Sequence, residues 1–295
     1  MVEHAPHEKN LGWEYVYNEN NIDPMLGDQF LSAAYYRADD DYQGRTTVPA
    51  LIDTATGKVV NNDYNWLTTY FEVNFRPWHK KGAPELYPVE LREEIDKMNL
   101  WLFDNINNAV YRSSFSRSNE GHFDGVNTFY AAMDRLEKRL ETNRFIFGDY
   151  VTDSDIRLYV TLARLDIRYT TQLGETKRPL YTYKNLWGYA KELWEIPAFA
   201  HHTDFAAIIR QGRIEGEEDG FRASTHYDLA LPKIDWDAQW KVSTERAYLS
   251  SDPTHPIYLG NNRRFYIDPT WYDLGAESPK KEEKETPPSC GCCCG

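Results

Sequence analysis

The stretch VTDSDIRLYVTLARLDIRY (151–169) contains the clearest helix start in the chain. Thr152 and Asp155 form a threonine–aspartate variant of the capping box, in which each side chain bonds a backbone N–H that the first helical turn leaves free. Val151 and Ile156 stand at the two positions of a hydrophobic staple. The apolar face then continues through Val160 and Ala163. The stretch therefore predicts a buried helix that begins at Thr152 and includes residues 153–167.

Apolar residues spaced three and four apart predict further helices on both sides of this stretch. Two upstream series have this spacing: Leu91, Ile95, Met98, Leu102, Ile106 and Val110, followed by Val126, Phe129, Met133, Leu136 and Leu140. Two more helices are expected near 184–195 and 197–211. Residues 89–228 are thus predicted to form an all-helical domain.

The chain before this domain has a mixed pattern. It predicts a short helix at 26–36, two strands at 46–53 and 57–60, and a helix over 61–75 that opens at Asp63. Residues 1–75 are therefore expected to form a partial α/β domain, and residues 76–88 a linker rich in proline, glycine and charge. Residues 229–277 form an aromatic-rich extension expected to wrap the body. Residues 278–295 are expected to be a flexible charged tether with a cysteine-rich tail.

Composition excludes several classes of protein. The net charge is −13, which argues against nucleic-acid binding because phosphate contacts need clustered Lys and Arg. No apolar run approaches the roughly 18 residues of a membrane-spanning helix, and the polar N-terminus does not resemble a signal peptide. The histidines show no metal-ligand spacing, so no metal is expected. A body without cysteine needs no disulfides, and the predicted location is cytoplasmic.

Several ordered motifs resemble one family. They are GW (12–13), YYRADDDYQGRTTVPAL (35–51), VVNND (59–63), LYPVELREEIDKMN (86–99), NNAVYRSSF (107–115), FGDYVTDSDIRLYVTLARLD (147–166) and YKNLWGYAKELWEIP (183–197). In these motifs the chain resembles the glutathione transferase superfamily, and most closely the glutathionyl-hydroquinone reductases of the Xi class. The resemblance implies an α/β plus all-α fold: a truncated thioredoxin-like N-terminal domain followed by a glutathione transferase C-terminal helical bundle.

The resemblance also implies where a glutathione site would lie. Val48 and Pro49, expected to be a cis-proline, match the backbone edge that pairs with glutathione. Asp63 matches the acidic residue that holds the γ-glutamyl group, but Tyr64 replaces the serine that follows it in the family. Capping of the helix alone would also explain Asp63.

Two tyrosines match the family's quinol pocket. Tyr111 and Tyr169 stand at the corresponding positions, and both would also suit core aromatics with hydrogen-bonded hydroxyls. A third family tyrosine would fall near Gly212 and Arg213, where there is none. Arg157 and Asp166 are expected to be buried structural partners.

The family's nucleophile, a cysteine in a Cys-Pro-Trp motif, has no match in this sequence. All four cysteines of the chain are in its tail: Cys290, Cys292, Cys293 and Cys294. S-acylation, such as palmitoylation, is the favoured interpretation of this cluster, and it would place the protein at a membrane surface. Soft-metal binding, replacement of the missing nucleophile and no specific role are the alternatives.

Two functions remain open. The lack of the Cys-Pro-Trp unit and the change at Tyr64 favour a pseudoenzyme that serves as a binding or structural subunit of a larger assembly. Such a subunit would contact other proteins through the extension 229–277 and could form a homodimer. The alternative is a glutathione-dependent transferase or reductase acting on glutathionyl-hydroquinones or similar aromatics. Glutathione is the expected cofactor, bound weakly or not at all, and no reductase turnover is expected.

Overall fold

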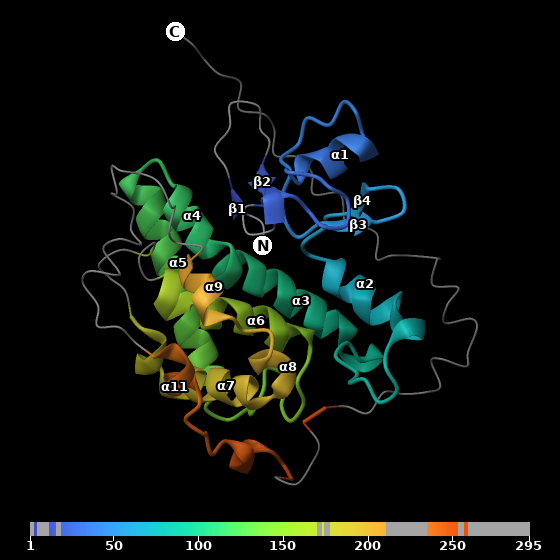
Figure 1. The fold of residues 1–295 in the computed structure, drawn as a ribbon. Helices are drawn as coiled ribbons and strands as arrows, with labels where there is room; N and C mark the ends of the chain where they lie inside the picture. Colours follow the sequence, from blue (N-terminus) through green and yellow to red (C-terminus); the bar gives the residue numbers. More distant parts are fainter. Residues whose placement is uncertain are drawn as a thin grey trace.

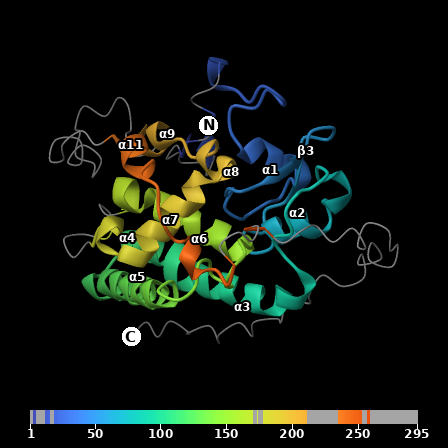
Figure 2. The same ribbon diagram turned by 90° about the horizontal axis from the view of Figure 1, so that it is seen from below.

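The computed structural model describes residues 3–4, 12–15, 19–169, 173, 178–210, 235–252 and 257–258. Within them a small α/β part at the N-terminal end lies against a larger helical bundle (Figures 1 and 2). This arrangement agrees with the fold class expected from the sequence. None of the described helices is both long and apolar enough to cross a membrane.

The α/β part is built around two short antiparallel sheets. Strand β1 (Glu3–His4) pairs with β2 (Trp13–Glu14), and β3 (Leu51–Asp53) pairs with β4 (Lys58–Asn61). A short 3-10 turn, η1 (Glu19–Asn21), follows β2, and helix α1 (Ser32–Ala38) packs beside β4. Arg37 of α1 donates from Nε to the carbonyl oxygen of Gly57 at 2.9 Å, which joins the helix to the turn between β3 and β4.

Three predicted boundaries in this part are wrong. The helix expected at 26–36 begins only at Ser32, because Asp23 accepts the N–H of Leu26 and holds a turn before it. The strand expected at 46–53 is shortened to β3, since Pro49 has no N–H to donate to a ladder. The helix expected over 61–75 is α2 (Leu67–Val73), which is preceded by a turn in which the Asp63 carbonyl accepts the N–H of Leu67 at 2.9 Å.

The linker is packed against the rest of the protein. It starts with a 3-10 turn, η2 (Arg76–Trp78), and leads to η3 (Val89–Leu91). Arg76 and Glu85 form a buried ion pair, with 2 % and 5 % of their side chains exposed, and Arg76 Nη2 lies 2.7 Å from Glu85 Oε1. An ion pair this well buried fixes the path of the linker between the two parts of the fold.

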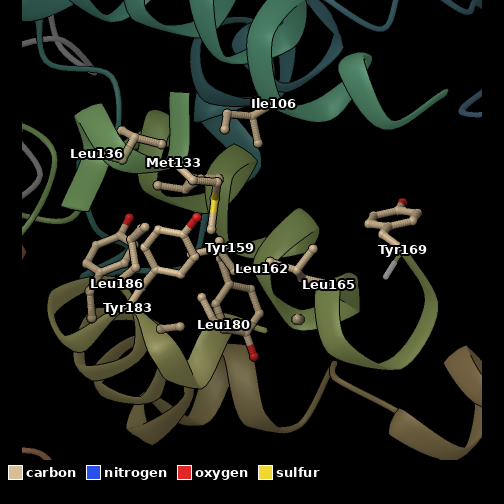
Figure 3. Close-up of a cluster of buried hydrophobic side chains, with 14 of the residues drawn as sticks. Ile106, Met133, Leu136, Tyr159, Leu162, Leu165, Tyr169, Leu180, Tyr183 and Leu186 are labelled. Atoms are coloured by element: carbon tan, nitrogen blue, oxygen red, sulfur yellow. The ribbon is translucent and has the colours of Figure 1, made fainter. Parts of the chain in front are cut away.

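The helical bundle follows in chain order. Its elements are α3 (Arg92–Leu102), the π-helical turn η4 (Phe103–Asn107), α4 (Ala109–Phe115), α5 (Asn119–Arg139), α6 (Asp153–Arg164), the π-helical turn η5 (Leu165–Tyr169), η7 (Leu180–Thr182), α7 (Lys184–Glu195), α8 (Pro197–Ala200) and α9 (Phe205–Arg210). Side chains of α5, α6 and α7 meet in the core (Figure 3). The helix expected at 197–211 is divided into α8 and α9.

Helix α6 confirms the predicted capping box. Asp155 accepts from the N–H of Thr152 at 2.8 Å and from its hydroxyl at 2.9 Å. Asp155 is fully buried and also accepts from the N–H of Ile146 and the hydroxyl of Tyr189. The carboxylate therefore joins two further segments, the loop at Ile146 and the helix that carries Tyr189, to the start of α6.

The apolar face predicted for α6 is wrong in one respect. Val160 is 38 % exposed, whereas Leu158, Tyr159, Leu162 and Ala163 are buried. The helix turns its leucines toward the core, so of the predicted series Ile156, Val160 and Ala163 the middle residue lies outside the buried side.

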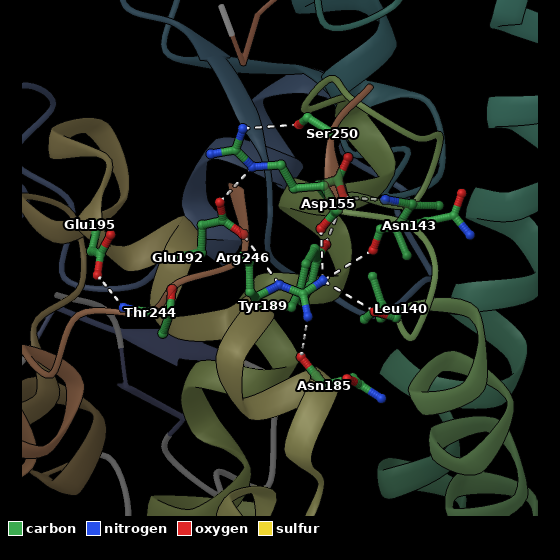
Figure 4. Close-up of polar contacts among 12 residues, drawn as sticks. Leu140, Asn143, Asp155, Asn185, Tyr189, Glu192, Glu195, Thr244, Arg246 and Ser250 are labelled. Atoms are coloured by element: carbon green, nitrogen blue, oxygen red, sulfur yellow. Dashed lines mark hydrogen bonds and ion pairs between the residues drawn. The ribbon is translucent and has the colours of Figure 1, made fainter. Parts of the chain in front are cut away.

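The described part of the extension is anchored in the bundle. It contains α11 (Trp236–Trp240) and η8 (Ala247–Leu249), and both tryptophans at the ends of α11 are buried. Arg246 pairs with Glu192 and donates to the carbonyl oxygens of Asn143 and Arg144 (Figure 4). Trp236 and Trp240 thus belong to the protein's own core. The tether and tail at 278–295 lie outside the described residues.

Candidate functional site

The loop that resembles a glutathione-binding edge is held in a defined shape. The Val48–Pro49 peptide bond is cis, as expected, and Val48 is 43 % exposed. The hydroxyl of Tyr35 donates to the carbonyl oxygen of Thr47 at 2.6 Å. Gly12 lies against Thr46 with φ of 74°, and a Cβ there would collide with the threonine side chain. Val48 is therefore open to solvent while the base of the loop is fixed.

Asp63 and Tyr64 follow β4 at the start of the turn before α2. Asp63 accepts the N–H of Asn65 at 3.1 Å, so its carboxylate supports a turn that precedes α2, whose own N-cap residue is Trp66 and has no side-chain cap. The ring of Tyr64 lies 5.2 Å from that of Phe103 and is 38 % exposed. Burial raises the pKa of the Tyr64 hydroxyl, Arg157 lowers it, and Tyr111 raises it further. Tyr64 therefore stays protonated at neutral pH and can act as a donor.

Tyr111 and Tyr169 are brought together by α4 and η5. Their hydroxyl oxygens are 3.0 Å apart and their rings meet edge-on at 5.9 Å between centroids. Tyr169 is 7 % exposed and lies at one side of the buried cluster in Figure 3, whereas Tyr111 is 41 % exposed. Burial raises the pKa of Tyr169 well above its ordinary value, and Tyr111 adds to the rise. One hydroxyl donates to the other, which leaves one O–H available to a bound molecule.

The two groups of residues lie near each other. Tyr111 acts on the pKa of Tyr64, and Arg164 lowers the pKa of both Tyr64 and Tyr169. Arg164, at the end of α6, was not singled out from the sequence. An arginine in a last helical turn ordinarily indicates only a favourable interaction with the helix dipole. The arrangement places a cation and three phenol hydroxyls in one region between the α/β part and the bundle.

A buried polar network holds the two parts of the fold in register beside this region. Asp153 accepts from Thr68 Oγ1 at 3.1 Å, from Asn99 Nδ2 at 2.8 Å and from Arg157 Nε at 2.8 Å. Arg157 also donates to the carbonyl oxygen of Asn65 at 2.8 Å. A small, solvent-open hollow is lined in part by Asn65, Asn99 and Arg157. Arg157 is thus the buried structural partner that the sequence predicted.

Asp166 has a similar structural role. Its carboxylate accepts the N–H of Leu180 at 2.6 Å and so joins η5 to η7. Burial raises its pKa to about 6, and the backbone N–H groups of Leu180 and Tyr181 oppose that rise. Its contacts with backbone account for the residue without a catalytic task.

The nucleophile and metal predictions concern cysteine, histidine and carboxylate side chains. The described residues include no cysteine, because Cys290 to Cys294 lie beyond them, as does the position of the third family tyrosine near Gly212. Among the described side chains, no group of three or more His, Asp or Glu is arranged to hold a metal ion. The described site therefore offers hydroxyls, a backbone edge and a cation for binding.

Comparison with known proteins identifies relatives of this arrangement. The family model "Glutathione S-transferase, C-terminal domain" matches residues 109–192. The chain is 33% identical over 186 residues to "Glutathionyl-hydroquinone reductase YqjG" of Escherichia coli, a match covering 63% of this chain and 56% of that protein. It thus matches little more than half the length of that relative.

Solved structures agree with these matches. A glutathione transferase from Gordonia bronchialis superimposes with a TM-score of 0.72 at 31% identity, over 85% of this chain and 78% of that one. The glutathione-bound structure of YqjG superimposes with a TM-score of 0.65 at 31% identity, over 72% of this chain and 68% of that one. Glutathione transferase Xi 1 from Trametes versicolor superimposes with a TM-score of 0.64 at 32% identity, over 71% of this chain and 73% of that one.

Proposed function

This chain belongs to the glutathione transferase superfamily, with relatives of the Xi class, and on that premise we propose that it is a glutathione-dependent transferase or reductase acting on hydroquinone-type aromatics. Glutathione would pair with the backbone edge at Val48 and Pro49. The aromatic ring would lie beside Tyr111 and Tyr169. The glutathione-bound YqjG structure supports the first half of this proposal.

The tyrosine pair is the observation that carries the proposal. Tyr111 and Tyr169 share one hydrogen bond of 3.0 Å, so one phenol O–H remains to donate to a ligand. A hydroquinone presents hydroxyl oxygens on a flat ring, which suits a phenol donor and an aromatic edge. Burial raises the pKa of Tyr169, which keeps its proton in place at neutral pH. The pair can therefore orient the ring and stabilise negative charge that develops on its oxygen.

The proposed reaction also needs a source of thiolate. Reduction of a glutathionyl-hydroquinone breaks a carbon–sulfur bond and forms a disulfide, so it needs a thiolate nucleophile. A second glutathione is one source of that thiolate, and the four tail cysteines are another. The residues of the described site do not supply it.

A second candidate function rests on this same feature. The chain before Cys290 contains no cysteine, and Tyr64 stands where the family has serine. A protein that has kept the binding site and lost thiol catalysis would act as a ligand-binding or structural subunit.

One pair of measurements distinguishes the two. Calorimetric titration with glutathione tests binding, and turnover of a glutathionyl-hydroquinone with excess glutathione tests chemistry. We expect binding that is weakened by Val48→Pro, which removes a backbone N–H from the edge, and not by Val242→Pro at an exposed position away from it. Turnover supports the enzyme, binding without turnover supports a ligand-binding subunit, and no binding refutes both of these and leaves a structural subunit.

A further inference from the structure

Three aromatic side chains form an exposed row on α2 and η2. Phe71, Phe75 and Trp78 are 39 %, 40 % and 77 % exposed. Each ring contacts the next: the ring centroids of Phe71 and Phe75 are 5.3 Å apart, and those of Phe75 and Trp78 are 5.8 Å apart. We call these three residues the aromatic row. Trp78 is the most exposed of them, and a side chain of this size left in water is unfavourable unless something covers it.

The row is fixed by what lies behind it. Arg76, between Phe75 and Trp78, points inward and pairs with buried Glu85, so its neighbours on the turn face outward. His79 closes the turn with a ring nitrogen 2.8 Å from the carbonyl oxygen of Phe71. The row is therefore held in place before any partner arrives, which reduces the entropy lost on binding.

Positive charge borders the row on a chain that is strongly acidic. Lys80 and Lys81 follow Trp78 and are both exposed, whereas the whole chain has a net charge of −13. Residues 71–85 contain two acidic side chains, Glu72 and Glu85. Glu85 is neutralised by Arg76, and burial raises the pKa of Glu72 to about 8, so it is largely uncharged at neutral pH. Lys80 and Lys81 are therefore the remaining charges of this segment, and salt screens charges that lie more than about 8 Å away.

We propose that the aromatic row, together with Lys80 and Lys81, docks the protein on an anionic membrane surface. Trp78 and Phe75 would enter the headgroup layer, and the two lysines would contact lipid phosphates and carboxylates. The row lies on α2 and η2 at the outer edge of the molecule, away from α5 and α7 (Figures 1 and 2). A protruding tryptophan beside lysines suits the interface between water and lipid, where an apolar ring and a charged end can both be satisfied.

The cysteine tail is a second membrane signal in the sequence. One weak signal gives only marginal, reversible binding, and stable anchoring takes two. Roughly 30 residues separate Tyr258 from Cys290, and a fully extended chain of that length reaches about 100 Å. An acyl chain on the tail could therefore act at the same membrane as the aromatic row, whichever way the row faces.

The test is sedimentation of the unacylated 295-residue chain with lipid vesicles. The protein should sediment with vesicles of phosphatidylcholine and phosphatidylserine (3:1) more than with pure phosphatidylcholine, and high salt should reduce the difference. Trp78→Ala should reduce the fraction bound, and Lys80→Glu combined with Lys81→Glu should reduce it by at least about fivefold.

Matched control variants change comparably exposed side chains of similar kind outside the aromatic row. Met25→Ala removes a side chain that is 71 % exposed, and Lys138→Glu combined with Lys241→Glu makes the same charge change elsewhere. Neither should alter binding, and thermal denaturation checks that Trp78→Ala is folded. The proposal is overturned if the chain does not sediment with anionic vesicles, if controls and patch variants lose binding equally, or if the row binds an acidic protein and no vesicle.

Discussion

Removal of the Asp155 carboxylate should cost the protein far more than the loss of an ordinary helix cap. Four donors point at this fully buried group: the N–H and hydroxyl of Thr152, the N–H of Ile146 and the hydroxyl of Tyr189. A lost N-cap costs about 0.5–2 kcal/mol. Each buried donor left without an acceptor adds about 1–3 kcal/mol, and two of the four donors lie outside the capping box. We therefore expect Asp155→Ala to lower the free energy of unfolding by about 3–5 kcal/mol.

The assay is urea denaturation followed by circular dichroism, with Asp204→Ala as the matched control. Asp204 is exposed and accepts the N–H of Ala207 at 2.9 Å in the first turn of α9, so its loss should cost about 1 kcal/mol. Tyr189→Phe removes one of the donors, and the double variant with Asp155→Ala should cost less than the sum of the two single variants. Equal losses for Asp155→Ala and Asp204→Ala would refute the reasoning, since they would reduce Asp155 to a surface cap.

Three further predictions concern other parts of the molecule. Tyr64→Ser restores the hydroxyl that the family has after its acidic residue and should raise glutathione affinity by roughly tenfold or more in calorimetry; unchanged or weaker binding would show that this position does not contact the ligand. Burial raises the pKa of Glu72 from 4.5 to about 8, so the folded state binds this proton more tightly than the unfolded chain and stability should fall as pH rises between those values. Glu72→Gln should lessen that fall, which melting temperatures at pH 5 and pH 9 would measure, and equal slopes for both proteins would contradict it. Arg246→Ala leaves the buried Glu192 with Arg144 as its remaining cation and should destabilise the chain by about 3–5 kcal/mol in urea, whereas a loss below about 1 kcal/mol would mean that the extension is not anchored there.

Local rules predicted the parts of this fold whose cause is local. The capping box at Thr152 and Asp155 needs only residues three apart, so the sequence located the start of α6. The buried face of α6 depends on which neighbours surround it, and the apolar character of Val160 gave the wrong answer. Likewise, the strand propensity of residues 46–50 did not outweigh the missing N–H of Pro49.

The candidate site was predicted by resemblance more than by pattern. Tyr111 and Tyr169 are far apart in sequence, and spacing alone gives no sign that their hydroxyls lie 3.0 Å apart. The long-range role of Arg246 was missed for the same reason, because its partners on Leu140, Asn143 and Arg144 are backbone carbonyls, which have no sequence signature. The extension 229–277 was predicted to contact other proteins, yet its Trp240 is 3 % exposed and packs on Trp187 and Phe205.

The most direct test of the account is the affinity for a glutathionyl-hydroquinone compared with that for glutathione alone. If the ring lies beside the tyrosine pair, the conjugate binds more tightly than glutathione. Tyr111→Phe combined with Tyr169→Phe removes both hydroxyls of the pair and should then reduce that advantage by roughly threefold to tenfold, which is the worth of one hydrogen bond, while leaving glutathione binding unchanged. Tyr181→Phe, at a residue 61 % exposed, serves as the control and should change neither affinity. Equal affinities for the two ligands, or a conjugate affinity unaffected by the double Tyr111→Phe and Tyr169→Phe variant, would contradict the proposal that this pair recognises the aromatic ring.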